Sequence, residues 1–292
     1  MIRIRKGRER FPFSKGILAK SIARTGLGLD EVYEIVRDIQ MELQRQGQED
    51  VRTSEIKQMV CDALIDRGHR AEERHYRVTR QIQYLERPVV VMIGGGTGVG
   101  KSTIAAELAH RLGITRFIGS DGIREIMRYM VPHDFMPLLH ESSFVAGRRL
   151  QNPFVQENIV YAFAQQVNMV SEGVLAFIRR GIKEGLHTML NGIHLVPGYV
   201  DLEDERDQMF CFHYILHLSD VEQHIQHIYS RSEGSRRDPD RYVDRMNNIR
   251  DIQQFITDMA RQHDVPVIEN RDFDQTLATI MDDIITTLEE HQ

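Results

Sequence analysis

A glycine-rich segment near residue 100 has the residue types that hold a phosphate chain. It matches the pattern G-x-x-x-x-G-K-[ST] and reads Gly95-Gly96-Thr97-Gly98-Val99-Gly100-Lys101-Ser102, with Thr103 next. Glycines allow backbone N–H groups to converge on a phosphate, and a helix that starts there adds positive partial charge. Lys101 can then reach the β- and γ-phosphates, while the Ser102 hydroxyl can ligate Mg²⁺. The segment therefore predicts a nucleotide site with Mg²⁺; a chance glycine-rich turn is the alternative.

This phosphate cradle does not by itself say what accepts the phosphate. NTPase motors and GTPases carry the same pattern. GTPases usually have an Asn-Lys-x-Asp segment that recognises guanine, and the sequence contains none. A motor would need a larger core and a clearly acidic strand end. The small size and the arginine-rich later segments favour a small-molecule kinase.

A second group of candidate residues follows the predicted strand at residues 116–119. The carboxyl ends of parallel strands are where doubly wound folds bind ligands, so Asp121 could orient an attacking hydroxyl or accept its proton. In the alternative, Ser120 or Asp121 only caps the next helix. Arg124 and Arg128 are spaced i, i+4 and could bind one anionic substrate, unless they belong to an ordinary salt-bridged surface helix.

Three histidines are further candidates for site residues. His194 lies in the segment 191–198, which ends another predicted strand, and could contact the substrate, although a lone histidine is more often structural. His224 and His227 are spaced i, i+3 but have no recognisable metal-ligand context. We therefore expect these two on a surface helix.

The segment 230–239 is a flexible, arginine-bearing stretch between predicted helices. Its arginines could close over the nucleotide as a lid that neutralises charge on the transferring phosphoryl group and excludes water. The candidates are Arg231, Arg236 and Arg237. A solvated loop is the alternative.

Alternating strands and helices should position these residues. Val89–Ile93 is an apolar run typical of a strand buried on both faces. Further strands are predicted at 116–119, 187–190, 210–218 and 265–269, and helices at 102–112, 158–184 and 242–263. This alternation predicts an α/β fold in which helices flank a parallel sheet.

The first part of the chain has a different pattern. After a short extended start, apolar spacing predicts helices at 27–46, 53–67 and 71–85, and Arg87-Pro88 ends the last one. Residues 1–87 carry a net charge of +4, whereas the rest carries −10. We therefore predict a small, mainly helical domain at residues 1–86 and a larger domain at residues 87–292.

Composition excludes several classes of protein. The hydrophobic fraction of 41% suffices for a packed core, and the net charge of −6 argues against a nucleic-acid-coating protein. Cys61 and Cys211 are too few for a disulfide scaffold or a zinc cluster. No apolar run approaches the ~20 residues of a membrane span, and the start has no apolar signal segment. These features predict a soluble, cytoplasmic protein without nucleic-acid or membrane partners; a homo-oligomer is left open.

Several segments taken together resemble the archaeal-type 2-phosphoglycerate kinases, which combine an ATP-cone-like N-terminal region with a P-loop kinase domain. The resemblance covers nearly the whole chain and is carried by residues 12–18, 95–103, 120–128, 139–144, 192–198 and 249–253. It implies transfer of a phosphoryl group from ATP to the free hydroxyl of 2-phosphoglycerate. The products would be ADP and 2,3-diphosphoglycerate, the precursor of cyclic 2,3-diphosphoglycerate.

Such a substrate carries both a carboxylate and a phosphate, so it needs several arginines near one hydroxyl, which Arg124, Arg128 and the lid arginines would supply. The sequence departs from the family at Asn191, where related kinases tend to have an acidic residue. A neutral amide there would weaken the Mg²⁺ site or leave its role to Asp121. Two alternatives therefore stay open: a kinase for another small anionic metabolite, and an ATP-sensing regulator that transfers nothing.

Overall fold

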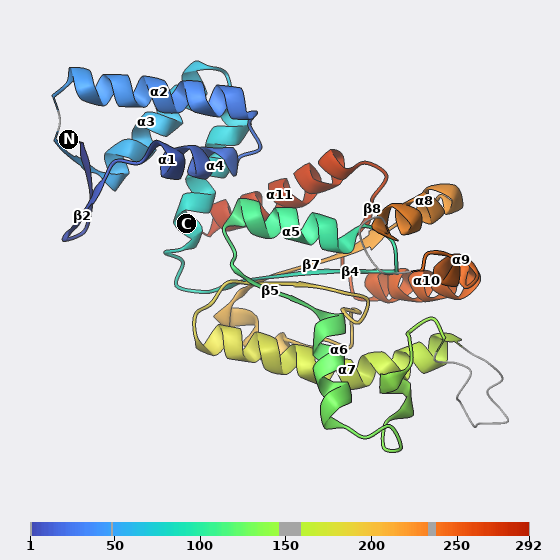
Figure 1. The fold of residues 1–292 in the computed structure, drawn as a ribbon. Coiled ribbons are helices and arrows are strands. Elements are labelled where there is room, and N and C mark those ends of the chain that lie inside the picture. The colour runs from blue at the N-terminus through green and yellow to red at the C-terminus, as the bar shows by residue number, and fades with distance from the viewer. Residues whose placement is uncertain (1, 48, 146–158, 233–237, 292) are drawn as a thin grey trace. The chain divides into compact units, whose positions relative to one another are not determined.

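The computed structural model describes residues 2–47, 49–145, 159–232 and 238–291. They divide into two units (Figure 1), of which the first comprises residues 1–85, 110–113 and 281–292 and the second comprises 86–109 and 114–280. The first unit thus takes in two segments that lie beyond the predicted division at residues 86 and 87. That division stays a prediction.

The first unit combines a small sheet with four helices. Its sheet has the order β2-β1-β3, in which β1 is antiparallel to β2 and parallel to β3. The elements are β1 (Arg3–Lys6), β2 (Glu9–Pro12), α1 (Lys15–Ala23), α2 (Leu29–Arg45), β3 (Asp50–Arg52), α3 (Thr53–Asp66) and α4 (Arg70–Ile82). The three predicted helices are confirmed as α2, α3 and α4.

Helix α1 was not predicted, because its nine residues offer too little apolar periodicity to distinguish a helix. Packing decides it instead, since Leu18 and Ile22 are buried in the core of this unit. The side chain of Ser14 caps the helix by accepting a hydrogen bond from the backbone N–H of Ile17 at 3.3 Å.

The second unit is built on a five-stranded sheet whose neighbouring strands are all parallel. The strand order is β5-β6-β4-β7-β8. The strands are β4 (Val89–Gly95), β5 (Arg116–Gly119), β6 (Thr188–Asn191), β7 (Phe210–His217) and β8 (Val267–Glu269). All seven residues of β4 are buried, as expected for a central strand with both faces covered.

Helices cover both faces of this sheet. In Figure 1, α5 and the beginning of α11 lie over one face, and α7 and α10 lie over the other. The helices are α5 (Lys101–Leu112), α6 (Ser120–Met130), α7 (Ile159–Lys183), α8 (Val221–Ser232), α9 (Asp240–Val243), α10 (Met246–Gln262) and α11 (Phe273–Glu290), with 3₁₀ turns η1 (Pro137–His140) and η3 (Glu203–Gln208). The predicted α/β fold with a helix-flanked parallel sheet is confirmed.

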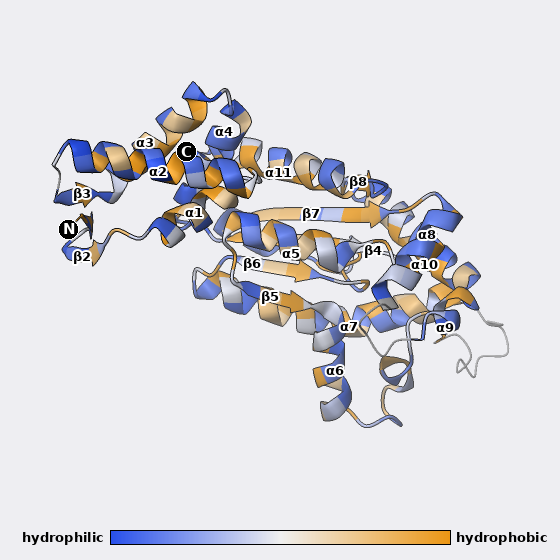
Figure 2. Cartoon of the chain, turned by 45° about the horizontal axis from the view of Figure 1, so that its top comes forward, coloured by the Kyte–Doolittle hydropathy of each residue, from blue (hydrophilic) through white to orange (hydrophobic). Residues whose placement is uncertain are grey.

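Two predicted elements differ in detail. The helix expected over 242–263 is two helices, α9 and α10. No element was predicted after residue 269, where the structure has α11. Figure 2 shows apolar residues concentrated in the strands of the larger sheet, with polar residues on the outer sides of its helices.

Strand register brings the candidate site residues to one edge of the sheet. Ile93 of β4 and Gly119 of β5 both pair with Asn191 of β6. Because parallel strands all end at the same edge, the segments that follow these residues start side by side. The cradle, the first turn of α6 and the segment after β6 therefore meet there.

No helix among the described residues has the length and hydropathy to cross a membrane.

Candidate active site

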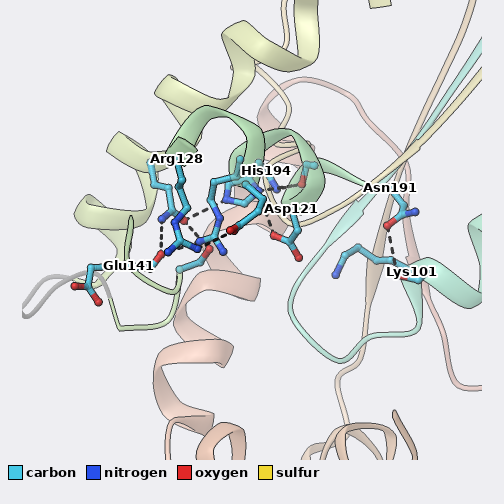
Figure 3. Close-up of polar contacts among 12 residues, drawn as sticks. Lys101, Asp121, Arg128, Glu141, Asn191 and His194 are labelled. Atoms are coloured by element: carbon cyan, nitrogen blue, oxygen red, sulfur yellow. Dashed lines mark hydrogen bonds and ion pairs between the residues drawn. The ribbon is translucent and has the colours of Figure 1, made fainter. Parts of the chain in front are cut away.

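A cavity of about 600 Å³ opens at this edge of the sheet. Both the phosphate cradle and the acceptor candidates contribute to its walls. Its lining residues include Gly98, Lys101, Ser102, Asp121, Arg124, Ser142, Ser143, Phe144, Asn191, His227, Arg231, Asn270 and Arg271. Figure 3 shows Lys101 and Asp121 directed toward the same space from different elements. The structure thus joins the two groups that the sequence placed apart.

The cradle keeps its shape because glycine is required at particular positions. Gly95, Gly98 and Gly100 have φ values of 131°, 88° and 86°, which other residues rarely adopt. A Cβ at Gly95 would lie 2.3 Å from the carbonyl oxygen of Leu216, and one at Gly100 would lie 2.4 Å from Nδ2 of Asn270. Backbone and space both exclude a side chain, so the loop can approach an anion closely.

Lys101 is buried at the start of α5, and its ammonium donates to the carbonyl of Gly96. Burial lowers the pKa of Lys101 to about 7, with Arg231 adding to the shift and Asp121 opposing it. A polyphosphate in the cavity would supply the opposite charge that this buried ammonium lacks. The side chain is therefore suited to binding phosphate.

Ser102 and Asn191 form the oxygen-rich part of the cavity. The Ser102 hydroxyl donates to Oδ1 of Asn191 at 3.4 Å, as drawn in Figure 3. Mg²⁺ prefers oxygen ligands and usually keeps several waters and phosphate oxygens. Among the described residues no cluster of three or more His, Cys, Asp or Glu side chains could hold a metal ion. A magnesium site here fits Ser102 together with nucleotide oxygens and water, with Asn191 orienting the hydroxyl.

Asp121 lies in the first turn of α6 and faces the cavity. The N-cap of α6 is Gly119 and no side chain caps this helix, so the capping alternative finds no support in the structure. The cavity wall around Asp121 partly desolvates its carboxyl, which would raise the pKa, but the positive charges nearby, Arg124 and Lys101 among them, lower it by more. The ionised carboxylate can accept a hydrogen bond from a hydroxyl.

The two arginines of α6 have different surroundings. Arg124 lines the cavity and donates to the carbonyl of Glu141 at 2.7 Å, while its Nε is buried with no hydrogen-bond partner among the described residues. Arg128 does not line the cavity and forms an ion pair with Glu125 at 2.8 Å. The structure therefore brings Arg124, but not Arg128, to the predicted acceptor site.

His194 lies behind the cavity wall. It is fully buried and is not among the lining residues. Its Nδ1 lies 2.9 Å from Oγ of Ser120, and its Nε2 lies 3.2 Å from Oε1 of Gln166. Burial lowers the pKa of His194 to about 4, so the ring is neutral at neutral pH.

The expectation for the α8 histidines was wrong in one case. His224 is fully buried, and its Nε2 lies 2.6 Å from the carbonyl of Thr97 in the cradle. His227, on the same helix, lines the cavity. Periodicity in α8 alone could not show that one side of this helix packs under the cradle.

Of the predicted lid arginines, Arg231 lies at the end of α8 and lines the cavity. Arg236 and Arg237 lie outside the described residues.

Several cavity residues were not among the predicted site residues. Asn270 and Arg271 follow β8, and the rule used for Asp121, that residues after a parallel strand meet at one edge, would have found them. Asn270 donates to the carbonyl of Val99 at 2.8 Å and so also supports the cradle. Ser142 and Ser143 belong to the segment 139–144, which carries part of the family resemblance but was not assigned a role at the site.

The chain is similar to known proteins in its first part and over its whole length. Residues 1–84 match the family model of the ATP cone domain. A solved gluconokinase from Sinorhizobium meliloti aligns with 71% of this chain and 99% of its own at a TM-score of 0.37 and 11% identity, a similarity too low to carry an argument.

The curated relatives match over almost the full length. A 2-phosphoglycerate kinase from Pyrococcus furiosus is 40% identical, over 96% of this chain and 92% of its own. Those from Thermococcus kodakarensis and Methanopyrus kandleri are 39% and 36% identical, over 96% and 98% of this chain and 95% and 88% of theirs. The chain therefore belongs to the 2-phosphoglycerate kinase family.

Proposed function

We propose that this chain transfers the γ-phosphoryl group of ATP to the free hydroxyl of 2-phosphoglycerate, giving ADP and 2,3-diphosphoglycerate. The observation that carries the proposal is the shared cavity, in which Asp121 and Arg124 of α6 face the phosphate cradle. A kinase needs a nucleotide site and an anion-binding acceptor site that open into one space. The relatives that match the whole chain are named for this activity.

On the nucleotide side, Lys101 and the cradle amides bind the β- and γ-phosphates. Ser102 would hold Mg²⁺, which would neutralise phosphate charge when bound. Arg231, at the end of α8, stabilises the charge on the transferring group. Gln253 and His224 pack against the cradle. A Cβ at Gly96 would lie 3.0 Å from Cβ of Gln253, and Nε2 of His224 contacts the carbonyl of Thr97.

On the acceptor side, Asp121 orients the hydroxyl of 2-phosphoglycerate and takes up its proton as the new bond forms. The bond from the γ-phosphorus to the bridging oxygen breaks while the bond from that phosphorus to the acceptor oxygen forms, and ADP leaves with the electron pair. Arg124 binds the carboxylate or phosphate of the acceptor through its free donor groups. Arg128 does not line the cavity and is paired with Glu125, so we assign it no contact with the acceptor.

ADP formation with 2-phosphoglycerate, with 3-phosphoglycerate and without an acceptor tests the proposal. We expect formation to depend on 2-phosphoglycerate. Stronger formation with another anionic alcohol would support the alternative kinase, for which the neutral Asn191 leaves room. Nucleotide binding without acceptor-dependent ADP formation would identify an ATP-sensing regulator and refute the proposal.

A further inference from the structure

Four buried polar side chains form a continuous chain behind the acceptor wall of the cavity. They come from the start of α6, the segment after β6, the middle of α7 and the loop after η1. The residues are Ser120, His194, Gln166 and Ser143, with exposed fractions of 1%, 0%, 0% and 6%. Burying polar groups is costly unless each finds a partner. These side chains satisfy one another, which indicates a built feature rather than incidental burial.

The hydrogen bonds admit one consistent assignment of donors and acceptors. The Gln166 amide nitrogen donates to the carbonyls of Leu138 at 2.6 Å and Glu141 at 3.0 Å. Its Oε1 therefore accepts, from the Ser143 hydroxyl at 2.6 Å and from Nε2–H of His194 at 3.2 Å. Nδ1 of the neutral ring must then accept from the Ser120 hydroxyl, at 2.9 Å. In this assignment, no two donor hydrogens of the network point at each other.

The chain of bonds holds a loop that faces the cavity. Ser142, Ser143 and Phe144 line the cavity, whereas Gln166 and His194 do not. Gln166 binds this loop from the buried side through two carbonyls, and Arg124 binds it from the cavity side through the carbonyl of Glu141. We name residues 138–144 the acceptor loop.

The network ends beside the proposed acceptor-orienting carboxylate, without a hydrogen bond to it. Ser120 adjoins Asp121 at the start of α6, and Oδ1 of Asp121 lies 3.8 Å from Nδ1 of His194. Figure 3 shows His194 beside Asp121, with Arg128 and Glu141 on the far side. One buried network thus links the first turn of α6 to the acceptor loop.

We propose that His194 and Gln166 are positioning residues that fix the acceptor loop and the first turn of α6 as one wall of the acceptor site without touching the acceptor. This inference rests on the proposed function, because it assumes that the acceptor binds against this wall. The sequence left direct contact between His194 and the substrate open. Because the ring is fully buried, His194 acts indirectly instead, through the residues it holds in place.

The variant Gln166→Glu tests the inference by replacing the amide donor with a carboxylate that faces two carbonyls. We expect the KM for 2-phosphoglycerate to rise at least about tenfold, because two carbonyls of the acceptor loop lose their buried donor. The KM for ATP should stay within about twofold. Backbone amide exchange should become faster in residues 138–144. Gln166→Met removes these two donor bonds and also the oxygen that accepts from Ser143 and His194, without adding charge, and it serves if the first variant does not fold.

Gln253→Glu provides the matched control. Gln253 is also a buried glutamine, and its amide nitrogen donates to the carbonyl of Leu218 at 2.9 Å, but it packs under Gly96 of the cradle. The same substitution should therefore change the KM for ATP rather than that for the acceptor. If both variants raise both KM values alike, the effect is general destabilisation and the inference is wrong.

Two variants of His194 separate positioning from simple packing. His194→Gln can still present an N–H to Gln166, whereas the shorter His194→Asn can reach Ser120 but not Gln166. We expect His194→Gln to stay within a few-fold of the unaltered KM for the acceptor, and His194→Asn to behave like Gln166→Glu. Equal effects of the two variants would contradict the inference.

The exchange measurement needs no substrate, so it separates the inference from the proposed function. If the unaltered chain makes no ADP with 2-phosphoglycerate, the proposed function fails while the loop measurement still applies. If exchange in residues 138–144 does not change in Gln166→Glu and Gln166→Met, the positioning role is refuted.

Discussion

At the scale of single residues, the site depends on a few groups whose surroundings set their chemistry. Lys101 is buried against the carbonyl of Gly96, and Asp121 carries its charge beside basic side chains. These two residues belong to the nucleotide and acceptor sides of one cavity. Their removal should therefore affect different steps.

Lys101→Ala should reduce kcat by at least ~100-fold, because a phosphate-binding cation is lost at the transferring group. The far-ultraviolet circular dichroism spectrum should be unchanged. Lys183→Ala, at an exposed position of α7, is the control and should keep full activity. Near-normal turnover of Lys101→Ala would refute the assignment of the cradle.

Asp121→Asn tests the acceptor side. We expect kcat to fall about 100-fold with little change in the KM for ATP, because the amide cannot take up the proton of the hydroxyl. Asp134→Asn is a suitable control, since the Asp134 side chain is fully exposed. A kcat close to that of the unaltered chain would mean that another group orients the acceptor.

At the scale of elements, the spacing of residues in α6 determines which side chains share a face, whereas packing determines which of them reach the cavity. An i, i+4 spacing places Arg124 and Arg128 on one face of a helix, but only Arg124 reaches the cavity. The loop carbonyl of Glu141 holds Arg124 in place, whereas Glu125 on the same helix draws Arg128 away. The partner of each guanidinium, which the spacing does not reveal, decides its role.

This difference predicts unequal effects of matched substitutions. Arg124→Gln should raise the KM for 2-phosphoglycerate at least ~10-fold, as expected for a charge-assisted contact. Arg128→Gln should raise it by no more than about threefold. Steady-state kinetics with varied acceptor at saturating ATP measure both values. A larger effect at Arg128 would indicate that the acceptor binds nearer the C-terminal end of α6 than we propose.

At the scale of the whole molecule, burial of neutral histidine makes stability depend on pH. The pKa of His194 is about 4 in the folded protein and that of an ordinary histidine is 6.5, so the unfolded chain binds more protons between these values. The free energy of unfolding should hold its full value above pH 6.5 and decrease as pH falls toward 4, by up to about 1.4 kcal/mol per pH unit.

Denaturant unfolding at pH 7.5 and pH 5 measures this contribution. The unaltered chain should lose about 1–2 kcal/mol more stability between the two values than His194→Gln, which has no titrating group there. Equal losses would show that His194 does not titrate on unfolding.

The sequence by itself determined the α/β fold, the position of the cradle and the strand end that carries Asp121, because local patterns encode all three. Glycine spacing shapes a loop, apolar runs mark buried strands, and the parallel arrangement of those strands brings their ends together. Tertiary structure alone decided that Arg124 faces the cavity, that His194 lies behind its wall and that His224 supports the cradle. These outcomes depend on which distant segment packs against each side chain, and no local pattern records that.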